Sequence, residues 1–333
     1  MIKLVNFCQL TGKMKSKKIL IKCLFFCALA VSCSERENIR NYTFSGMGTV
    51  LSVIYAGEKN DALEDLLRKD VELIEKELSY YKPESFVSIL NRDAHLKEIV
   101  VPTHVCRLIE TALEYGKMTD GVFDITYKSE GALWDEGKEP GEKELKEKIK
   151  LTGSEMVSVD CEKNTVIFKK DGVKIDLGGI AKGYAIDRAG EIIKKNGINS
   201  FIINYGGDML VCGKKGKDPW KIGIKNPDDP SDHLKTLVFG ETDCTGVATS
   251  GDYERFFVIN NKKYSHIFDP RTGRPAIDAK SVTVTAQNAL IADVAATAVS
   301  VAIKEDELIK KIMEKFKVKI YTLSGSDLKW VEH

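Results

Sequence analysis

The stretch Val173-Lys-Ile-Asp-Leu-Gly-Gly-Ile-Ala-Lys-Gly-Tyr-Ala-Ile-Asp187 carries three structural signals in direct succession. The apolar residues of Val173–Leu177 predict a short strand, and Gly178 and Gly179 predict a tight turn after it. Ile180–Asn196 then predicts a helix that ends at Gly197. This order indicates a fold built from both strands and helices.

The rest of the chain continues this mixture. Apolar residues at helical spacing predict a helix over Asn60–Leu78, opened by a capping pattern of Asp61 and Glu64. Because hairpins and helices follow one another without strict βαβ alternation, the sequence predicts an α+β fold. Further helices are expected around Val105–Ala112, Asn288–Ile303 and Glu307–Phe316, strands at Val157–Val159, Val166–Phe168, Phe201–Tyr205, Met209–Cys212, Trp220–Ile224, Phe256–Ile259, Tyr264–Phe268 and Val282–Thr285, and hairpin turns at Asn260-Asn261 and Gly325-Ser326.

Composition and charge restrict the kind of protein. The 333 residues are 43% hydrophobic and 8% aromatic, with 50 Lys+Arg and 49 Asp+Glu, which is typical of a globular chain and not of a fibrous or disordered one. Residues 1–32 hold six lysines and no acidic residue, so the remaining 301 residues carry a formal charge of −5. Nucleic-acid binding is therefore not expected, because phosphate backbones need a basic surface.

The N-terminal segment is typical of an export signal. Residues 14–33 contain a basic beginning, a short apolar stretch interrupted by Lys22, and small residues before Cys33, with Met14 as a candidate start. The apolar part is shorter than the roughly 18 residues of a membrane-spanning helix, so a permanent transmembrane anchor is the weaker interpretation. Ala30-Val31-Ser32-Cys33 resembles a lipobox, in which the Cys33 thiol is lipidated after cleavage. The alternative is a plain cleaved signal.

We therefore expect a signal peptide over residues 1–33 and one functional domain over residues 34–333. The domain is expected to be exported and held at the cell envelope by lipid on Cys33, outside the cytoplasm. Four further cysteines, Cys106, Cys161, Cys212 and Cys244, are widely spaced and form no metal-binding pattern. Although exported proteins form disulfides, four scattered cysteines in a chain of this length are expected to pack as small buried hydrophobic residues.

The glycine turn is the first candidate binding site. Main-chain N–H groups at a helix N-terminus bind phosphate, and Lys182 adds a positive charge there. The segment matches neither the P-loop nor the Rossmann pattern, so these two nucleotide-binding classes are excluded. On its own, such a turn is more often only the junction between a strand and a helix.

Asp293 and Thr297 form a second candidate site. They are four residues apart in an Ala-rich helix, so their side chains share one face. A carboxylate and a hydroxyl together suit a hard cation such as Mg²⁺, which prefers oxygen ligands and keeps coordination positions for phosphate. The alternative is a buried aspartate that only caps a helix or forms an ion pair.

His266 is the candidate catalytic base. It follows a predicted strand and precedes an Asp-Pro turn, and imidazole titrates near neutral pH, so it suits removal of a proton from a hydroxyl nucleophile. A purely structural histidine is the alternative. The polar turns Thr249–Arg255 and Thr119–Asp124 lie next to aromatic residues, as both ligand-binding loops and ordinary turns do.

Eight segments in order along the chain carry a family resemblance. They are Met47-Gly48-Thr49, Leu78–Pro83 with Ser85 and Asn91, Asp120–Asp124, Asp176–Gly183, Asn204–Asp208, Thr249–Asp252, His266–Pro270, and Ala292–Thr297. Together they resemble the FAD:protein FMN transferase family, the ApbE-type lipoproteins, over nearly the whole chain from about Phe44 onward. The lipoprotein-like leader is similar to that of the family as well.

The resemblance implies a T-fold-like ApbE architecture, with mixed sheets packed with helices, that binds FAD in a cleft. The implied reaction moves FMN from FAD to a Thr or Ser hydroxyl of a partner protein and releases AMP, with Mg²⁺ as cofactor. The expected partner is an exported flavoprotein subunit of a respiratory membrane complex. The residues implied to line the FAD site are Met47, Tyr81, Gly121, Val122, Phe123, Asp176, Lys182 and Ile267, with Tyr80 as a neighbouring alternative to Tyr81.

The same resemblance implies a metal held by the backbone carbonyl of Gly179 and the side chains of Asp293 and Thr297. Lys182 is expected to withdraw charge from the reacting phosphate, and His266 to act as base. With water in place of the hydroxyl, the same site would be an FAD pyrophosphatase that yields FMN and AMP. A flavin-binding lipoprotein without chemistry would need neither a base nor a metal, so these residues favour catalysis. Flavin redox catalysis finds no support, because the chain has no nicotinamide motif and no redox cysteine pair.

Overall fold

The computed structural model describes residues 38–131, 133–134, 137–227, 229, 231–240, 243–251, 256–276, 279–324 and 329–333. The predicted signal peptide, Asp252 and the predicted turn Gly325-Ser326 lie outside the described residues. Among the helices that are described, none is both long enough and apolar enough to cross a membrane.

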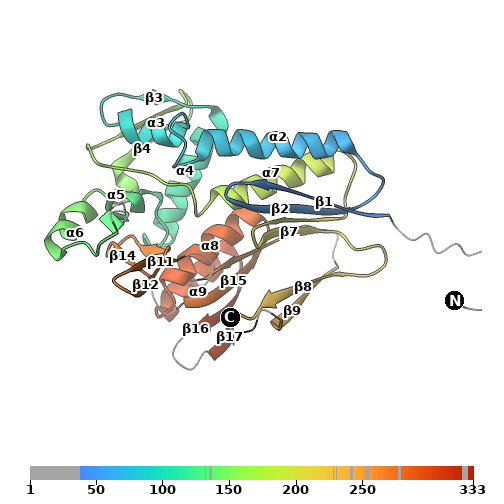
Figure 1. Cartoon of the computed structure of the whole chain (residues 1–333). Helices are drawn as coiled ribbons and strands as arrows, with labels where there is room; N and C mark the ends of the chain where they lie inside the picture. Colours follow the sequence, from blue (N-terminus) through green and yellow to red (C-terminus); the bar gives the residue numbers. More distant parts are fainter. Residues whose placement is uncertain are drawn as a thin grey trace, which may run out of the picture. The chain divides into compact units, whose positions relative to one another are not determined.

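An antiparallel sheet of eight strands underlies the domain (Figure 1). Its strand order is β1-β2-β6-β7-β10-β15-β16-β17. Successive side chains point to opposite faces, so Ile203 of β6 joins the main hydrophobic core and Ile202 joins a second one. The strands are β1 (Ile39–Gly46), β2 (Thr49–Ala56), β6 (Phe201–Tyr205), β7 (Asp208–Cys212), β10 (Thr245–Ser250), β15 (Ala279–Ala286), β16 (Lys319–Ser324) and β17 (Lys329–Glu332).

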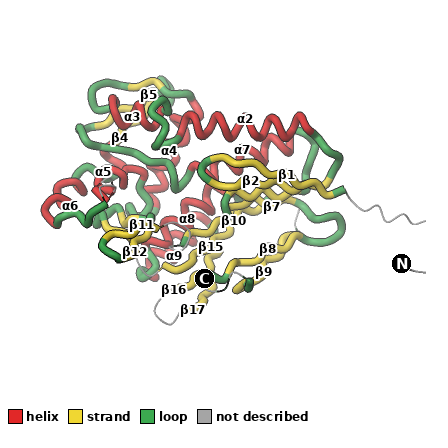
Figure 2. Tube along the Cα trace, viewed as in Figure 1, coloured by secondary structure: helices red, strands yellow, loops and turns green. Residues whose placement is uncertain are grey.

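Helices cover one face of this sheet, and a hairpin covers the other (Figure 2). Helices α7 and α8 pack on the central strands and on each other, and α2 packs on α7. On the opposite face, Trp220, Ile224 and Leu237 of the β8–β9 hairpin pack against Ile202 and Val211. These elements are α2 (Asp61–Leu78), α7 (Ala181–Lys195), α8 (Ala289–Val301), α9 (Asp306–Phe316), β8 (Trp220–Lys225) and β9 (His233–Phe239).

Shorter elements complete the domain. The sheet β3-β5-β4 packs against α4, and the β11–β12 hairpin packs Ile259 and Tyr264 against Trp134. The remaining elements are α3 (Phe86–Asp93), α4 (Thr103–Met118), η1 (Ile125–Tyr127), α5 (Lys128–Gly131), α6 (Glu142–Ile149), η3 (Ser154–Met156), β3 (Ile99–Val100), β4 (Val157–Asp160), β5 (Thr165–Phe168), β11 (Phe256–Ile259), β12 (Lys262–Ser265), β13 (Phe268–Asp269) and β14 (Arg274–Pro275). The predicted α+β class is confirmed, and every strand pair in the described part of the chain is antiparallel.

One local prediction differs in detail from the structure, and a second is confirmed. Helix α2 is capped by Asn60, whose side chain accepts a hydrogen bond from the Leu63 main-chain N–H at 3.0 Å, so the predicted capping pair Asp61 and Glu64 is displaced by one residue. The predicted hairpin turn is confirmed, because Asn260 and Asn261 have φ angles of 50° and 61°, which a tight two-residue turn requires.

The prediction of a strand at Val173–Leu177 is wrong. This segment is extended but belongs to no sheet. The Asn91 side-chain amide takes the place of a neighbouring strand, accepting from the Ile175 N–H at 2.7 Å and donating to the Ile175 carbonyl at 2.9 Å. The main-chain polar groups are thus satisfied by a side chain, which a pattern of apolar residues does not reveal.

The expectation for the cysteines is also wrong. Cys106 and Cys161 form one disulfide, and Cys212 and Cys244 form another. The first joins α4 to the residue after β4, and the second joins β7 to the residue before β10. Cysteines that are distant in sequence come close together because these elements lie side by side in the fold. Their spacing along the chain therefore could not predict the disulfides.

Candidate active site

The glycine turn before α7 lies against α8 and the segment after α4. A Cβ atom on Gly179 would lie 3.3 Å from Phe123 Cε2 and 3.5 Å from Thr297 Oγ1. The absence of a side chain therefore permits a close approach of three predicted site residues from separate segments.

Asp293 lies against the first turn of α7. It is 4% exposed, and its Oδ2 accepts a hydrogen bond from the Gly183 main-chain N–H at 3.0 Å. In return, Asp187 of α7 accepts hydrogen bonds from the Ala289 and Leu290 N–H groups, at 2.8 and 2.9 Å, at the start of α8. Each helix thus receives a carboxylate at its positive end. Burial raises the pKa of Asp187 to about 6.

Lys182, in the same turn of α7, forms an ion pair with Asp208 of β7. The Asp208 side chain is 2% exposed and that of Lys182 is 25% exposed. Asp208 Oδ1 also accepts a hydrogen bond from the Thr249 main-chain N–H at 3.1 Å. Because an ammonium group has three donors, Lys182 can hold Asp208 and still bind an anion. The sequence analysis missed this partner, although Asp208 ends one of the eight segments.

Asp176 organises the glycine turn itself. Its Oδ1 accepts a hydrogen bond from the Gly178 N–H at 2.8 Å, and its Oδ2 accepts one from the Tyr127 hydroxyl at 3.0 Å. The Asp176 main-chain N–H donates to the Ile125 carbonyl at 2.8 Å. Asp176 therefore connects the glycine turn to the segment that follows Gly121–Phe123.

The turn of Gly121–Phe123 lies against the loop that carries His266. Gly121 has a φ of 78°, and a Cβ on it would lie 4.0 Å from Arg271 Cγ. Val122 and Phe123 are buried. His266 is exposed at the bend between β12 and β13, whereas Ile267 beside it is buried. An exposed imidazole is accessible to a hydroxyl group of a second protein.

Met47 and Tyr81 belong to a second group of contacts, on the β1–β2 turn and the loop after α2. The Met47 N–H donates to Glu75 Oε2 at 3.2 Å, and Glu75 Oε1 pairs with Lys82 at 3.0 Å, so Glu75 connects these two segments. Tyr81 is 82% exposed, and Tyr80 packs partly against the core. Of the two tyrosines, Tyr81 is the more accessible to a planar ligand.

The proposed metal donors are all oxygen atoms. Among the described residues, no group of three or more His, Cys, Asp or Glu side chains is placed to hold a metal. The set implied by the sequence has one carboxylate, on Asp293, with the Thr297 hydroxyl and the Gly179 carbonyl. The close approach of Gly179 to Thr297 brings two of these donors together. The donor chemistry therefore fits a hard divalent cation such as Mg²⁺.

Glu130 is a buried carboxyl group that the sequence did not single out. It is fully buried, its Oε1 has no hydrogen-bond partner, and its Oε2 accepts a hydrogen bond from the Thr152 hydroxyl. Burial raises the pKa of Glu130 from 4.5 to about 8. The group is therefore protonated at neutral pH in the folded protein.

This raised pKa predicts a pH-dependent stability. The folded state binds more protons than the unfolded state between about pH 4.5 and 8, so the free energy of unfolding should fall as pH rises through that window. We expect Glu130→Gln to flatten this dependence and to be more stable than the wild type at pH 9, while the two differ little at pH 5. Urea unfolding at both pH values measures this, with the exposed Glu144→Gln as control. An unchanged wild-type slope in Glu130→Gln would contradict it.

Comparisons with known proteins extend over most of the chain. A protein of Haemophilus influenzae named FAD:protein FMN transferase is 28% identical over 330 residues, covering 93% of this chain and 94% of that protein. A protein of the same name from Treponema pallidum is 30% identical over 295 residues, covering 80% of each. The crystal structure of the ApbE protein from Thermotoga maritima has a TM-score of 0.80 and 31% identity, covering 89% of this chain and 97% of that one.

The fold and the site indicate an α+β enzyme that acts on a phosphate-bearing substrate. A lysine, a buried carboxylate and a glycine turn lie together at one helix N-terminus, where phosphate groups bind. The sequence model of the ApbE family matches residues 47–320. The chain belongs to the ApbE family, and the resemblance inferred from its eight segments is confirmed.

Proposed function

We propose that this protein is an FAD:protein FMN transferase that uses Mg²⁺ and a Thr or Ser hydroxyl of a partner protein. The names of its curated relatives support flavin transfer. The proposal rests mainly on one observation. Gly179, Thr297 and Asp293 lie close together at the start of α7, beside Lys182. These groups supply oxygen ligands for a cation and a positive charge for a diphosphate.

In the proposed reaction, the acceptor hydroxyl oxygen attacks the FMN phosphorus of FAD. A new P–O bond forms to the acceptor, the P–O bond to AMP breaks, and AMP departs with the bonding electron pair. The departing phosphate has a second pKa of about 6, so no strong general acid is needed. The acceptor hydroxyl must lose its proton, and exposed His266 takes it.

The protein's own charges assist this step. Lys182 stabilises the negative charge that develops on the phosphoryl oxygens. Mg²⁺ bound by Gly179, Asp293 and Thr297 would withdraw further charge from the diphosphate. Met47, Tyr81, Gly121–Phe123, Asp176 and Ile267 are proposed to line the FAD site.

Lys182→Met tests whether Lys182 acts on the substrate or only on Asp208. The single change should lower AMP release at least about tenfold, and should lower stability by about 2 kcal/mol because Asp208 is left buried without its partner, discounted for the partial exposure of Lys182. The double variant Lys182→Met/Asp208→Asn removes both charges. It should recover the stability, measured by urea unfolding, without recovering the activity. Recovery of full activity would show that Lys182 only neutralises Asp208.

We further propose that the protein is exported and held at the cell envelope through lipid on Cys33. The two disulfides support an oxidising compartment, because such bonds are rare in the cytosol. An exported flavoprotein subunit of a respiratory membrane complex is the proposed acceptor. Metabolic labelling with a fatty-acid analogue, compared between wild type and Cys33→Ala, tests the anchor.

The central experiment incubates the purified protein with FAD and Mg²⁺, with and without a candidate acceptor, and follows AMP, free FMN and the mass of the acceptor. Transfer predicts an FMN-sized mass gain on the acceptor with an equal amount of AMP. AMP and free FMN in both reactions would indicate a pyrophosphatase instead. Intact bound FAD with no AMP would indicate a binding protein and would overturn the roles of His266 and Asp293.

A further inference from the structure

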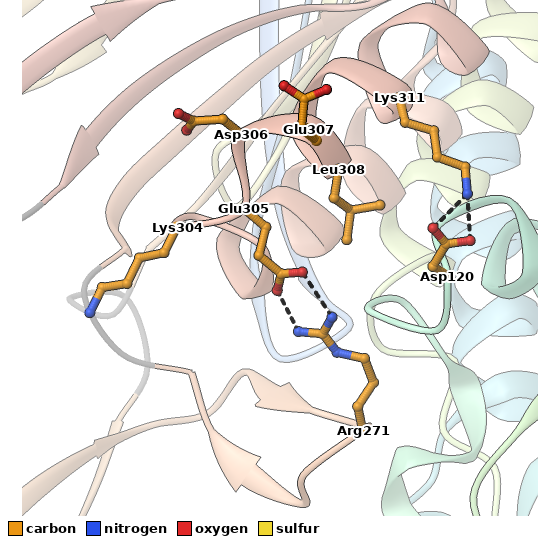
Figure 3. Close-up of a pocket in the computed structure, with 8 residues that line it drawn as sticks. All are labelled: Asp120, Arg271, Lys304, Glu305, Asp306, Glu307, Leu308 and Lys311. Carbon is orange, nitrogen blue, oxygen red and sulfur yellow. Dashed lines mark hydrogen bonds and ion pairs between the residues drawn. The ribbon is translucent and has the colours of Figure 1, made fainter.

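Arg271 connects three segments of the candidate active site through two carboxylates. Its Nε and Nη2 donate to Asp269 Oδ1 and Oδ2, both at 2.9 Å, and its Nη1 and Nη2 donate to Glu305 Oε2 and Oε1 at 3.1 and 2.6 Å. The Arg271 main-chain N–H also donates to Asp269 Oδ1 at 2.9 Å. Figure 3 shows the side chain reaching Glu305, in the connection between α8 and α9.

The three segments carry different parts of the proposed machinery. Asp269 lies in β13, two residues after buried Ile267 and three after exposed His266. Glu305 lies directly before α9, at the end of the short connection that follows α8, the helix of Asp293 and Thr297. Arg271 Cγ itself lies 4.0 Å from the position of a Cβ on Gly121. One side chain thus joins the loop of the base to the connection that follows the helix of the metal donors, and it lies beside the turn of the FAD site.

The loop of His266 is also held from the other side, because Phe268 packs against Trp134 and the Trp134 Nε1–H donates to the Gly273 carbonyl at 3.0 Å. Strands β13 and β14 have two residues each and pair only with one another among the described strands. A cavity of about 770 Å³ lies beside the loop, lined by Asp120, Arg271, Glu305 and Lys311 among others. On the opposite wall of this cavity, Lys311 of α9 binds both carboxylate oxygens of Asp120 (Figure 3). On the side that faces this cavity, the ion pairs of Arg271 join the loop to the connection between α8 and α9.

The ion pairs of Arg271 are partly exposed, so their effect on the position of the loop can be distinguished from their effect on the stability of the protein. The side chains of Asp269, Arg271 and Glu305 are 17%, 35% and 42% exposed, and ion pairs this accessible contribute little to the free energy of unfolding. A planar guanidinium bound by two carboxylates nevertheless fixes direction and distance, which a lysine ammonium does not. The ion pairs of Arg271 with Asp269 and Glu305, called the Arg271 clamp below, therefore affect the position of the loop more than the free energy of unfolding.

We propose that Arg271 is a positioning residue. Through Asp269 and Glu305, it holds the His266–Ile267 segment at a fixed position relative to the end of α8. The inference rests on the proposed function, because it assigns His266 and α8 to one reaction. Misplacement of a reacting group by about 1 Å can cost about a hundredfold in rate. Loss of the Arg271 clamp should therefore reduce turnover while substrate binding and the fold persist.

The test compares Arg271→Ala, Arg271→Lys and Glu305→Gln with Arg274→Ala. Arg274 is the matched control, since it lies in the same loop but pairs with Glu139 and Glu142 instead of Glu305. Two readouts are used: AMP release from FAD in the presence of Mg²⁺ and the acceptor protein, and amide hydrogen exchange over residues 266–276. The second readout does not require an active enzyme.

Arg271→Ala should lower kcat about 10- to 100-fold, with less than about a threefold change in KM for FAD, and should speed exchange over residues 266–276 about tenfold or more. Arg271→Lys should recover only part of kcat, Glu305→Gln should be intermediate, and Arg274→Ala should resemble wild type. Unchanged exchange and kcat in Arg271→Ala would overturn the inference, as would an equal loss in Arg274→Ala. If the wild type releases no AMP, the proposed function fails and the exchange measurement alone decides whether Arg271 holds the loop.

Discussion

Asp293→Asn is expected to reduce Mg²⁺-dependent AMP release from FAD by at least about a hundredfold, the scale on which removal of one preorganised electrostatic group lowers catalysis. The asparagine keeps the shape of the side chain and an oxygen that can accept the Gly183 N–H, so the contact at the start of α7 is retained. Only the negative charge is lost, and Asp293 is the one anionic ligand of the proposed set, because the Gly179 carbonyl and the Thr297 hydroxyl are neutral. The thermal unfolding midpoint should change little.

Asp187→Asn is the matched control for this experiment. Asp187 is also a carboxylate at the α7–α8 crossing, but it accepts main-chain N–H groups of α8 and is outside the proposed donor set. It should lower stability and leave the dependence on Mg²⁺ unchanged. The metal assignment is wrong if Asp293→Asn retains full activity at the same Mg²⁺ concentration.

The largest expected effect on stability comes from the disulfides. Replacing Cys106 and Cys161 together with serine should lower the free energy of unfolding by about 4 kcal/mol, because the bond closes a loop with a sequence separation of 55 residues and thereby restricts the unfolded chain. The Cys212–Cys244 pair, with a separation of 32, should contribute nearly as much. Since the two loops do not overlap in sequence, their effects should add.

Urea unfolding of the wild type, of both double variants and of the quadruple variant that combines them, with and without a reductant, measures these effects. The reductant should destabilise the wild type most, each double variant less, and the quadruple variant not at all. Wild-type protein that unfolds at the same urea concentration in both conditions would show that the disulfides do not contribute. Retained activity in the folded double variants is expected, because neither bond includes a proposed site residue.

Local sequence patterns were enough to predict most helices and the pair Asp293 and Thr297 of the candidate site. One stripe of α2 is buried, at Leu63, Leu67, Val71, Ile74 and Leu78, because a helix turns every 3.6 residues and one face must meet the core. The same period places Asp293 and Thr297 on one face of α8 before any tertiary contact is known. Strands β1, β2, β9 and β10 were not predicted, since their polar residues alternate with apolar ones in ways that loops also show.

The α+β class, the ApbE family, the helical pair Asp293 and Thr297, and the glycine turn with Lys182 could be inferred from the sequence, because each of these depends on neighbours within a few residues or on ordered motifs. Four contacts emerge from the folded structure alone: Lys182 pairs with Asp208, Asn91 replaces a strand beside Ile175, the cysteines form two disulfides, and Arg271 reaches Glu305. These contacts join residues 26 to 84 positions apart. Chain folding brings such residues together through the packing of whole elements, and no local period in the sequence records which side chains then meet.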